Sequence, residues 1–146
     1  MLHRNDLIGR WRLIAWSTRA DDGTVTHPFG ENPVGSLVYT PGGWMSAMLA
    51  AGERSPMSGA DLLGGSESER ALAFSTFIAY AGTYDVDRDD VVHRVTTSLF
   101  PNWVGGVQRR TAELAGDELL LRTAPLEVLG RVTVSELRWV REERFP

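Results

Sequence analysis

The hydrophobic residues near the N-terminus alternate with polar ones at the period of a β-strand. Successive side chains of a strand point to opposite faces of a sheet, so residues 9–18 are predicted to form a strand. Gly9 indicates a kink where this strand starts. The two faces contain Trp11, Leu13, Ala15 and Ser17 on one side and Arg10, Arg12, Ile14 and Trp16 on the other.

Short apolar segments separated by turn residues continue along most of the chain. Clusters of Gly, Pro, Asp and Asn between them are typical of tight turns. About eight to nine short strands with little else predict an all-β, mainly antiparallel sandwich or barrel. No repeat or linker interrupts the pattern, so residues 1–146 are expected to form a single domain. The further strands are expected at 24–26, 35–40, 44–49, 80–87, 91–100, 107–115, 118–124 and 131–141.

One segment in the middle of the chain has helical periodicity instead. Ser66 and Glu69 match a capping box, in which each side chain binds the backbone N–H of the other residue. We therefore predict one mid-chain helix over residues 66–79, preceded by a mobile loop at 50–65 that is rich in Gly and Pro. The apolar positions of the predicted helix are Leu72, Phe74, Phe77 and Ile78.

The amino-acid composition excludes several kinds of catalysis and argues against a nucleic-acid partner. The chain has 146 residues, of which 42% are hydrophobic, and this suits one globular domain with a sizeable core. It contains neither cysteine nor lysine, which excludes disulfides, thiolate nucleophiles and Schiff-base catalysis. The net charge is -4 and Arg109-Arg110 is the only basic doublet, so we expect no nucleic-acid partner.

The sequence also argues against a membrane partner, a metal site and a nucleotide cofactor. No apolar run approaches the ~20 residues of a membrane helix, and the N-terminus does not resemble a signal peptide. We therefore expect no membrane partner and a cytoplasmic location. The scattered His3, His27 and His93 indicate no metal site, and no nucleotide-binding motif indicates a cofactor. Edge strands could pair two copies in a homodimer.

The richest chemistry lies between residues 93 and 110. His93 is the one titratable side chain on the otherwise apolar face of its predicted strand, which also carries Val91, Val95, Thr97 and Leu99. On the return strand, Gln108 and Arg110 share one face and Arg109 takes the other. The corner between the strands, residues 100–103, adds Asn102 and Trp103. These groups predict an apolar pocket with a polar focus that holds a carbonyl or carboxylate.

Each candidate also has a structural interpretation. His93 can act as a general acid or base, or it can be a core residue bonded to a tyrosine or a backbone carbonyl. Arg110 can bind a ligand oxygen or form a buried ion pair with an acidic residue such as Glu113 or Glu136. Tyrosines and tryptophans can contact a ligand or pack the wall, and Trp11 is expected to plug one end. The predicted ligand contacts are Tyr39, Met45, Tyr80, Asn102, Trp103 and Trp139.

Several short motifs, spread in order over nearly the whole chain, resemble the lipocalin-like domain family, a group of small calycin-type barrels of bacteria and fungi. The resemblance implies an up-and-down barrel of about eight strands that is wide enough inside for one small ligand. The helix that packs beside the barrel in many lipocalins after the last strand has no counterpart here. The motifs are Gly9-x-Trp11, Gly35-x-Leu37-x-Tyr39, Gly43-x-Met45-Ser46, Tyr80-x-Gly82-x-Tyr84, His93, Phe100-Pro101-Asn102-Trp103-x-Gly105, Gln108-x-Arg110, Gly116-Asp117-x-Leu119-x-Leu121 and Leu137-x-Trp139.

Two functions are compatible with a barrel that has an apolar pocket and a polar focus. The first is a barrel that binds a small hydrophobic metabolite with a carbonyl or carboxylate, in the secondary (natural-product) metabolism to which the resemblance points. The second is a cofactor-independent cyclase or isomerase that folds a polyketide-like or terpenoid-like substrate in the same pocket. In the enzyme, His93 would move a proton while Gln108 or Arg110 stabilises charge on a carbonyl oxygen.

Overall fold

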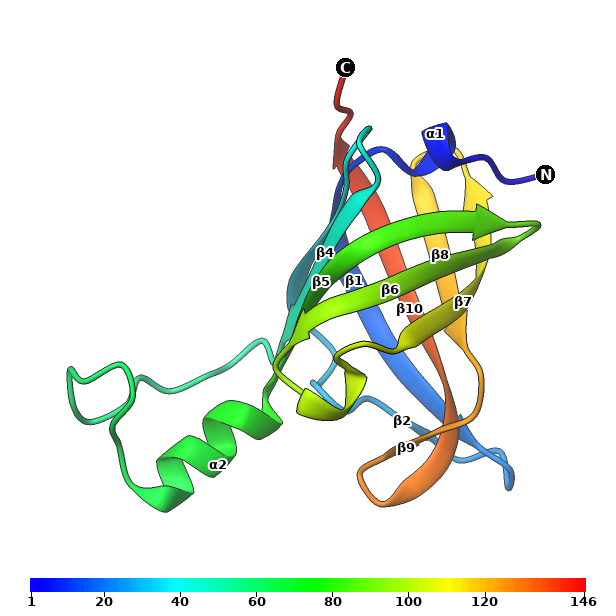
Figure 1. Ribbon diagram of the computed structural model, residues 1–146. Helices are drawn as coiled ribbons and strands as arrows, with labels where there is room; N and C mark the ends of the chain where they lie inside the picture. Colours follow the sequence, from blue (N-terminus) through cyan, green and yellow to red (C-terminus); the bar gives the residue numbers. More distant parts are fainter.

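The computed structural model describes all residues 1–146 and shows a closed antiparallel β-barrel (Figure 1). The strands follow the order β1-β3-β4-β5-β6-β7-β8-β10, and β10 pairs back with β1 to close an eight-stranded barrel. Strands β2 and β9 extend the sheet beside β1 and β10. The predicted all-β barrel is confirmed. The elements are α1 (Arg4–Leu7), β1 (Gly9–Ala20), β2 (Val25–Thr26), β3 (Val34–Tyr39), β4 (Trp44–Ala50), α2 (Glu67–Ser75), β5 (Phe77–Asp87), β6 (Asp90–Ser98), the 3-10 helix η1 (Pro101–Trp103), β7 (Val107–Ala115), β8 (Glu118–Thr123), β9 (Leu126–Val128) and β10 (Arg131–Glu143).

The mid-chain helix α2 begins where the sequence predicts and ends earlier. The Ser66 hydroxyl accepts from the N–H of Glu69 at 3.1 Å, and the Glu69 carboxylate accepts from the N–H of Ser66 at 3.0 Å. The prediction that the helix runs to residue 79 is wrong, because Phe77 and Ile78 open β5 and pair with Ala50 and its neighbour in β4. These apolar side chains gain burial in the sheet that a projecting helix does not provide. Neither α1 nor α2 is long and apolar enough to cross a membrane.

Two β-bulges change which side chains face the interior. The register of β1 against β10 shifts between Leu13 and Ala15. Ile14 is exposed, as its place on the face of Arg10 and Arg12 predicts, but Trp16, predicted on that same face, turns inward. A second shift lies between β5 and β6, where Ala81 and Gly82 oppose Thr97 and Val95. Thr97 is consequently exposed rather than on the inner face with His93. An extra residue in one strand reverses the in–out pattern beyond it.

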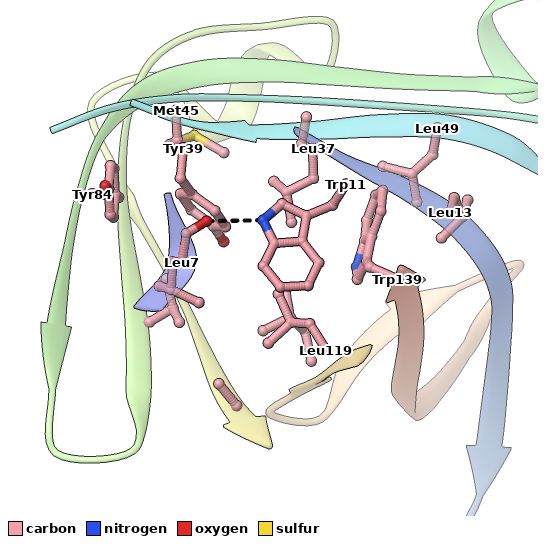
Figure 2. Close-up of a cluster of buried hydrophobic side chains, with 14 of the residues drawn as sticks. Leu7, Trp11, Leu13, Leu37, Tyr39, Met45, Leu49, Tyr84, Leu119 and Trp139 are labelled. Carbon is pink, nitrogen blue, oxygen red and sulfur yellow. Dashed lines mark hydrogen bonds between the residues drawn. The ribbon is translucent and has the colours of Figure 1, made fainter. Parts of the chain in front are cut away.

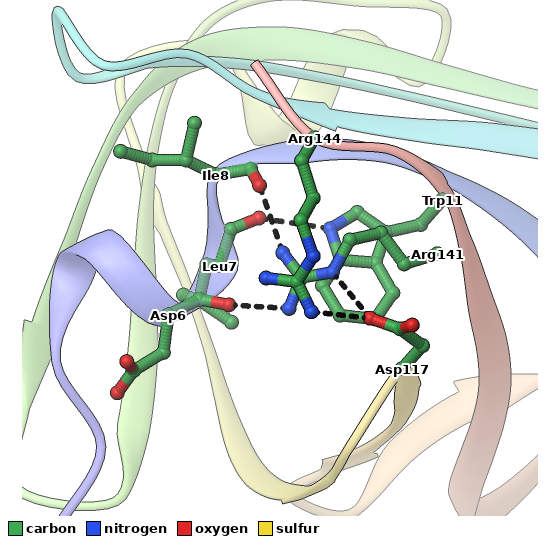
Figure 3. A network of polar contacts seen from close by, with 7 residues as sticks. All are labelled: Asp6, Leu7, Ile8, Trp11, Asp117, Arg141 and Arg144. Carbon is green, nitrogen blue, oxygen red and sulfur yellow. Dashed lines mark hydrogen bonds and ion pairs between the residues drawn. The ribbon is translucent and has the colours of Figure 1, made fainter. Parts of the chain in front are cut away.

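One end of the barrel, where both chain termini lie, is packed solid (Figures 1 and 2). Trp11 is fully buried there, as predicted, and its indole N–H donates to the carbonyl of Leu7 at 2.8 Å. The Arg141 guanidinium lies 4.1 Å from the Trp11 ring centroid. It also donates to the backbone carbonyls of Asp6 and Ile8 and to the Asp117 carboxylate (Figure 3). This network ties α1 across the barrel end and closes it.

Candidate ligand-binding cavity

A cavity of about 680 Å³ lies inside the barrel. Its lining includes residues of α2, η1 and β9, elements that lie at the end opposite the chain termini (Figure 1). Of its 26 lining residues, 18 are hydrophobic, and both its size and its lining are those of a small-molecule site. It reaches the surface where lining residues such as Phe74, Phe100 and Leu129 are exposed. The barrel therefore has one plugged end and one open end, and a ligand can enter through the latter.

The apolar wall of the cavity combines strand interiors with loops at the open end. Strands β3, β4, β8 and β10 supply aliphatic side chains such as Leu37, Leu49 and Leu137. Trp16, turned inward by the bulge in β1, packs edge-on against Phe29 with ring centroids 4.8 Å apart. The rim comes from the end of α2, from the loop that contains η1, and from residues 126–130 around β9. The sequence did not predict β9, although its apolar Leu-x-Val-Leu pattern between two turns was a usable signal.

Arg110 is a buried cation in this apolar wall. The alternation of β7 directs Gln108 and Arg110 inward and Arg109 outward, as predicted. Arg110 donates to the Gln108 amide oxygen at 3.4 Å and to the Arg109 carbonyl at 3.1 Å, and it makes no ion pair. Glu113 and Glu136, its predicted alternative partners, both pair with a different arginine, Arg122. Burying a cation without a carboxylate partner is costly, and an electron-rich atom placed in the cavity would lower that cost.

His93 sits beside Arg110 with a tyrosine on each ring nitrogen. Nε2 lies 2.7 Å from the Tyr39 hydroxyl, and Nδ1 lies 2.8 Å from the Tyr80 hydroxyl. Burial, with the Arg110 charge as a second cause, lowers the pKa of His93 to about 3. Burial also raises the pKa of Tyr39 and of Tyr80. All three groups are therefore neutral near pH 7, and His93 acts as a hydrogen-bonding residue inside the barrel.

Two aromatic side chains complete the polar part of the site. Trp103 packs edge-on against Tyr80, with centroids 5.3 Å apart, and its ring centroid lies 5.9 Å from the Arg110 guanidinium carbon. Trp139, at the boundary between the plugged end and the cavity, is buried, and its indole N–H has no acceptor in the protein. By contrast, the indole N–H of Trp16 is satisfied by the Ser135 hydroxyl at 3.0 Å.

The structure brings together five of the nine predicted site residues on the cavity wall. The other four lie elsewhere. Tyr39 and Met45 are fully buried toward the plugged end (Figure 2), Gln108 supports Arg110 from beside the cavity, and Asn102 is exposed on η1. Strand alternation predicts the side of the sheet that a residue faces but not its depth along the barrel axis. The five that line the cavity are Tyr80, His93, Trp103, Arg110 and Trp139.

A closed eight-stranded barrel around one ligand-sized cavity defines a lipocalin-like architecture. The sequence profile of the lipocalin-like domain family matches residues 8–142, and the chain belongs to this family. It is 33% identical over 110 residues to the 4'-hydroxy-3'-methoxypropiophenone carrier protein ppsC of Aspergillus oryzae (strain ATCC 42149 / RIB 40), an alignment that covers 69% of this chain and 99% of that protein. An uncharacterized protein from Bacteroides eggerthii DSM 20697, solved by crystallography, superposes with a TM-score of 0.45 at 14% identity over 93% of this chain and 99% of that one.

Proposed function

We propose that this protein is a carrier for a small hydrophobic metabolite whose carbonyl or carboxylate oxygen binds at Arg110. The observation that supports it most strongly is the Arg110 guanidinium, buried in an apolar cavity with no carboxylate partner. Such a cation is costly in the unliganded protein and becomes favourable when a ligand oxygen accepts its hydrogen bonds. The proposal places this chain among carriers of natural-product-like compounds, and the carrier from Aspergillus oryzae supports it by similarity.

The name of that relative also suggests the shape of the ligand. Its cargo is a phenyl ethyl ketone with hydroxyl and methoxy substituents on the ring. A flat aromatic ring of this kind suits a cavity lined by Trp16, Phe29, Trp103 and aliphatic side chains. We propose an aryl ketone or aryl carboxylate of similar size as the cargo here, with the ring among the apolar walls and the oxygen at the polar focus.

No observation favours the alternative, a cofactor-independent cyclase or isomerase. That mechanism needs His93 to take up and release a proton near neutral pH. Both ring nitrogens of His93 are engaged by tyrosines, and its pKa is lowered to about 3. Reversible binding requires only the cavity and the donors on its wall, so the carrier is the function that these contacts support.

Calorimetric titration with three probes of matched size tests the carrier proposal. The probes are 4'-hydroxy-3'-methoxypropiophenone, 2-methoxy-4-propylphenol, which lacks the carbonyl, and 3-(4-hydroxy-3-methoxyphenyl)propanoate, which carries a carboxylate. We expect the ketone or the carboxylate to bind about ten times more tightly than the propylphenol or better, because a hydrogen bond to a charged group contributes about 1.5–3 kcal/mol. Failure of both oxygen-bearing probes to bind better than the propylphenol would contradict the proposal.

A pair of adjacent arginines provides the matched variants. Arg110→Met removes the buried charge and keeps an apolar side chain, so it should weaken the preferred oxygen-bearing probe about tenfold or more and leave the propylphenol unchanged. Arg109→Met is the control, because Arg109 faces solvent and pairs with Asp87 and Asp90. Equal affinities of the two variants for the oxygen-bearing probe would show that Arg110 does not bind the ligand.

A further inference from the structure

The two tyrosines that flank His93 differ in what else their hydroxyls can reach. Tyr39 is 0% exposed, and its hydroxyl has His93 Nε2 as its one partner in the protein. Tyr80 lines the cavity, and its hydroxyl has His93 Nδ1 as its one protein partner. Each hydroxyl has one proton to donate. A proton of Tyr80 that is not used on His93 can serve a ligand or water in the cavity, whereas a proton of Tyr39 cannot.

This difference determines the direction of the hydrogen bonds. A neutral imidazole has one nitrogen that donates and one that accepts. If Nε2 carried the proton, it would donate to Tyr39, and the Tyr39 O–H would be left in the core without an acceptor, which is strongly disfavoured. If Nδ1 carries the proton, Tyr39 donates to Nε2, Nδ1–H donates to the Tyr80 oxygen, and the Tyr80 O–H remains free. In the second arrangement, the one hydroxyl proton without an acceptor in the protein belongs to Tyr80, which lines the cavity, where a ligand or water can accept it.

We propose that Tyr39 and His93 are positioning residues that hold Tyr80 as a hydrogen-bond donor toward the cavity. This inference rests on the proposed function, in that a ligand occupies the cavity. Arg110 also only donates, and Trp103 packs against both Tyr80 and Arg110. Tyr80 and Arg110 are two donors packed against the same tryptophan ring, and together they select an oxygen that has lone pairs and no proton. The site therefore favours a ketone or carboxylate oxygen over the phenol or alcohol of a similar molecule.

The tautomer of His93 can be observed without any ligand. Long-range proton–nitrogen NMR of the imidazole at pH 7 separates a protonated from an unprotonated ring nitrogen, and loss of the signals in His93→Gln assigns them. We expect Nδ1 to be protonated and Nε2 to be unprotonated. Protonation on Nε2 would overturn the inference while leaving the carrier proposal intact. Conversely, an Nδ1 proton in a protein that binds none of the three probes would support the hydrogen-bond direction and contradict the carrier.

A pair of tyrosine variants tests the effect on the ligand. Tyr39→Phe removes the donor to Nε2, so the tautomer of the imidazole is no longer fixed. The Tyr80 hydroxyl can then donate to Nδ1 instead of to the ligand. We expect mixed tautomers, roughly threefold to tenfold weaker binding of the preferred oxygen-bearing probe, and unchanged binding of 2-methoxy-4-propylphenol. Tyr84→Phe is the control, because Tyr84 packs 4.6 Å from the Tyr39 ring but donates to the Thr40 carbonyl. Equal weakening of both probes by Tyr39→Phe would mean that Tyr39 only packs the core and would overturn the inference.

Discussion

His93 shows at the residue scale how burial changes the chemistry of a side chain. It is 1% exposed, and its pKa is lowered to about 3, first by burial and then by the Arg110 charge. In the unfolded chain the same imidazole has a pKa near 6.5. Between about pH 3 and 6.5 the unfolded chain therefore binds one more proton at His93 than the folded protein does.

This difference predicts that the folded protein loses stability in mild acid. Because the unfolded state binds the extra proton, the free energy of unfolding should fall by about 1.4 kcal/mol for each pH unit below 6.5. The contribution is fully present above pH 6.5. Urea denaturation at pH 7.5, 6.5, 5.8 and 5.0 measures it. In the His93→Gln variant this pH dependence should be weaker by about 1.4 kcal/mol per pH unit, the contribution of one proton. The His27→Gln variant, which changes an exposed residue, should keep the full pH dependence. Identical slopes for all three proteins would contradict burial of a neutral His93.

The alternation of two strands predicted correctly which polar side chains face the interior, but the sequence did not predict which inward residues line the cavity. The inward direction of His93, Gln108 and Arg110 followed from the period of two strands, and the structure confirms it. Tyr39 and Met45 also face inward, but they lie toward the plugged end and do not line the cavity. Depth along a barrel depends on strand tilt and on the stagger between strands, which a single sequence does not display.

At the element scale, most strands were predictable and the β-bulges were not. The predicted strand 107–115 coincides with β7, since regular alternation and glycine turns define it locally. The bulge at Ile14 depends on how β1 pairs with β10, more than a hundred residues further along the chain. The bulge in β6 faces Gly82, where a Cβ atom would overlap the Arg94 carbonyl. Gly82 is the only local trace of that bulge in the sequence.

Helix α2 depends on local interactions more than any other element. The helix projects away from the barrel (Figure 1), and none of its residues is buried. It is held by its N-cap and by Arg54, which donates to the Thr76 hydroxyl and to the Ala73 carbonyl. Hydrogen bonds from Ser66 and Ser58 lower the pKa of Glu69 to about 2. Local stability of this kind should be separable from the stability of the barrel.

Substitution of the N-cap tests this separation. Ser66→Ala should destabilise α2 by about 1 kcal/mol, because it removes the acceptor for the Glu69 N–H. Hydrogen exchange of the α2 amides should become roughly fivefold faster, with amides of β5 to β8 unchanged. Ser68→Ala is the control, since the Ser68 hydroxyl contacts the Ser66 hydroxyl at 3.2 Å but accepts from no backbone N–H of the helix. Faster exchange throughout the barrel would show that α2 and the barrel unfold together.

Considered as a whole, the molecule places one buried arginine at each end of its interior. Arg141 at the plugged end is satisfied by the Asp117 carboxylate and by the carbonyls of Asp6 and Ile8, and it stacks on Trp11 (Figure 3). Arg110 in the cavity wall has two weak contacts to Gln108 and one to a backbone carbonyl. The plugged end gives its arginine a carboxylate and two backbone carbonyls, whereas the cavity wall gives Arg110 no carboxylate.

The same substitution at the two ends should therefore change stability in opposite directions. Arg141→Met leaves the backbone carbonyls of Asp6 and Ile8 without their donor and leaves Arg144 as the one donor to the Asp117 carboxylate. The unliganded protein should therefore lose about 2–4 kcal/mol of unfolding free energy. Arg110→Met removes a buried charge that has no carboxylate partner and should gain about 1–2 kcal/mol. Guanidinium denaturation of the unliganded variants measures both. The ketone should still bind to Arg141→Met and bind weakly to Arg110→Met. If both variants lost similar stability, Arg110 would be a structural residue like Arg141, because a group kept for its ligand contributes nothing to the unliganded fold.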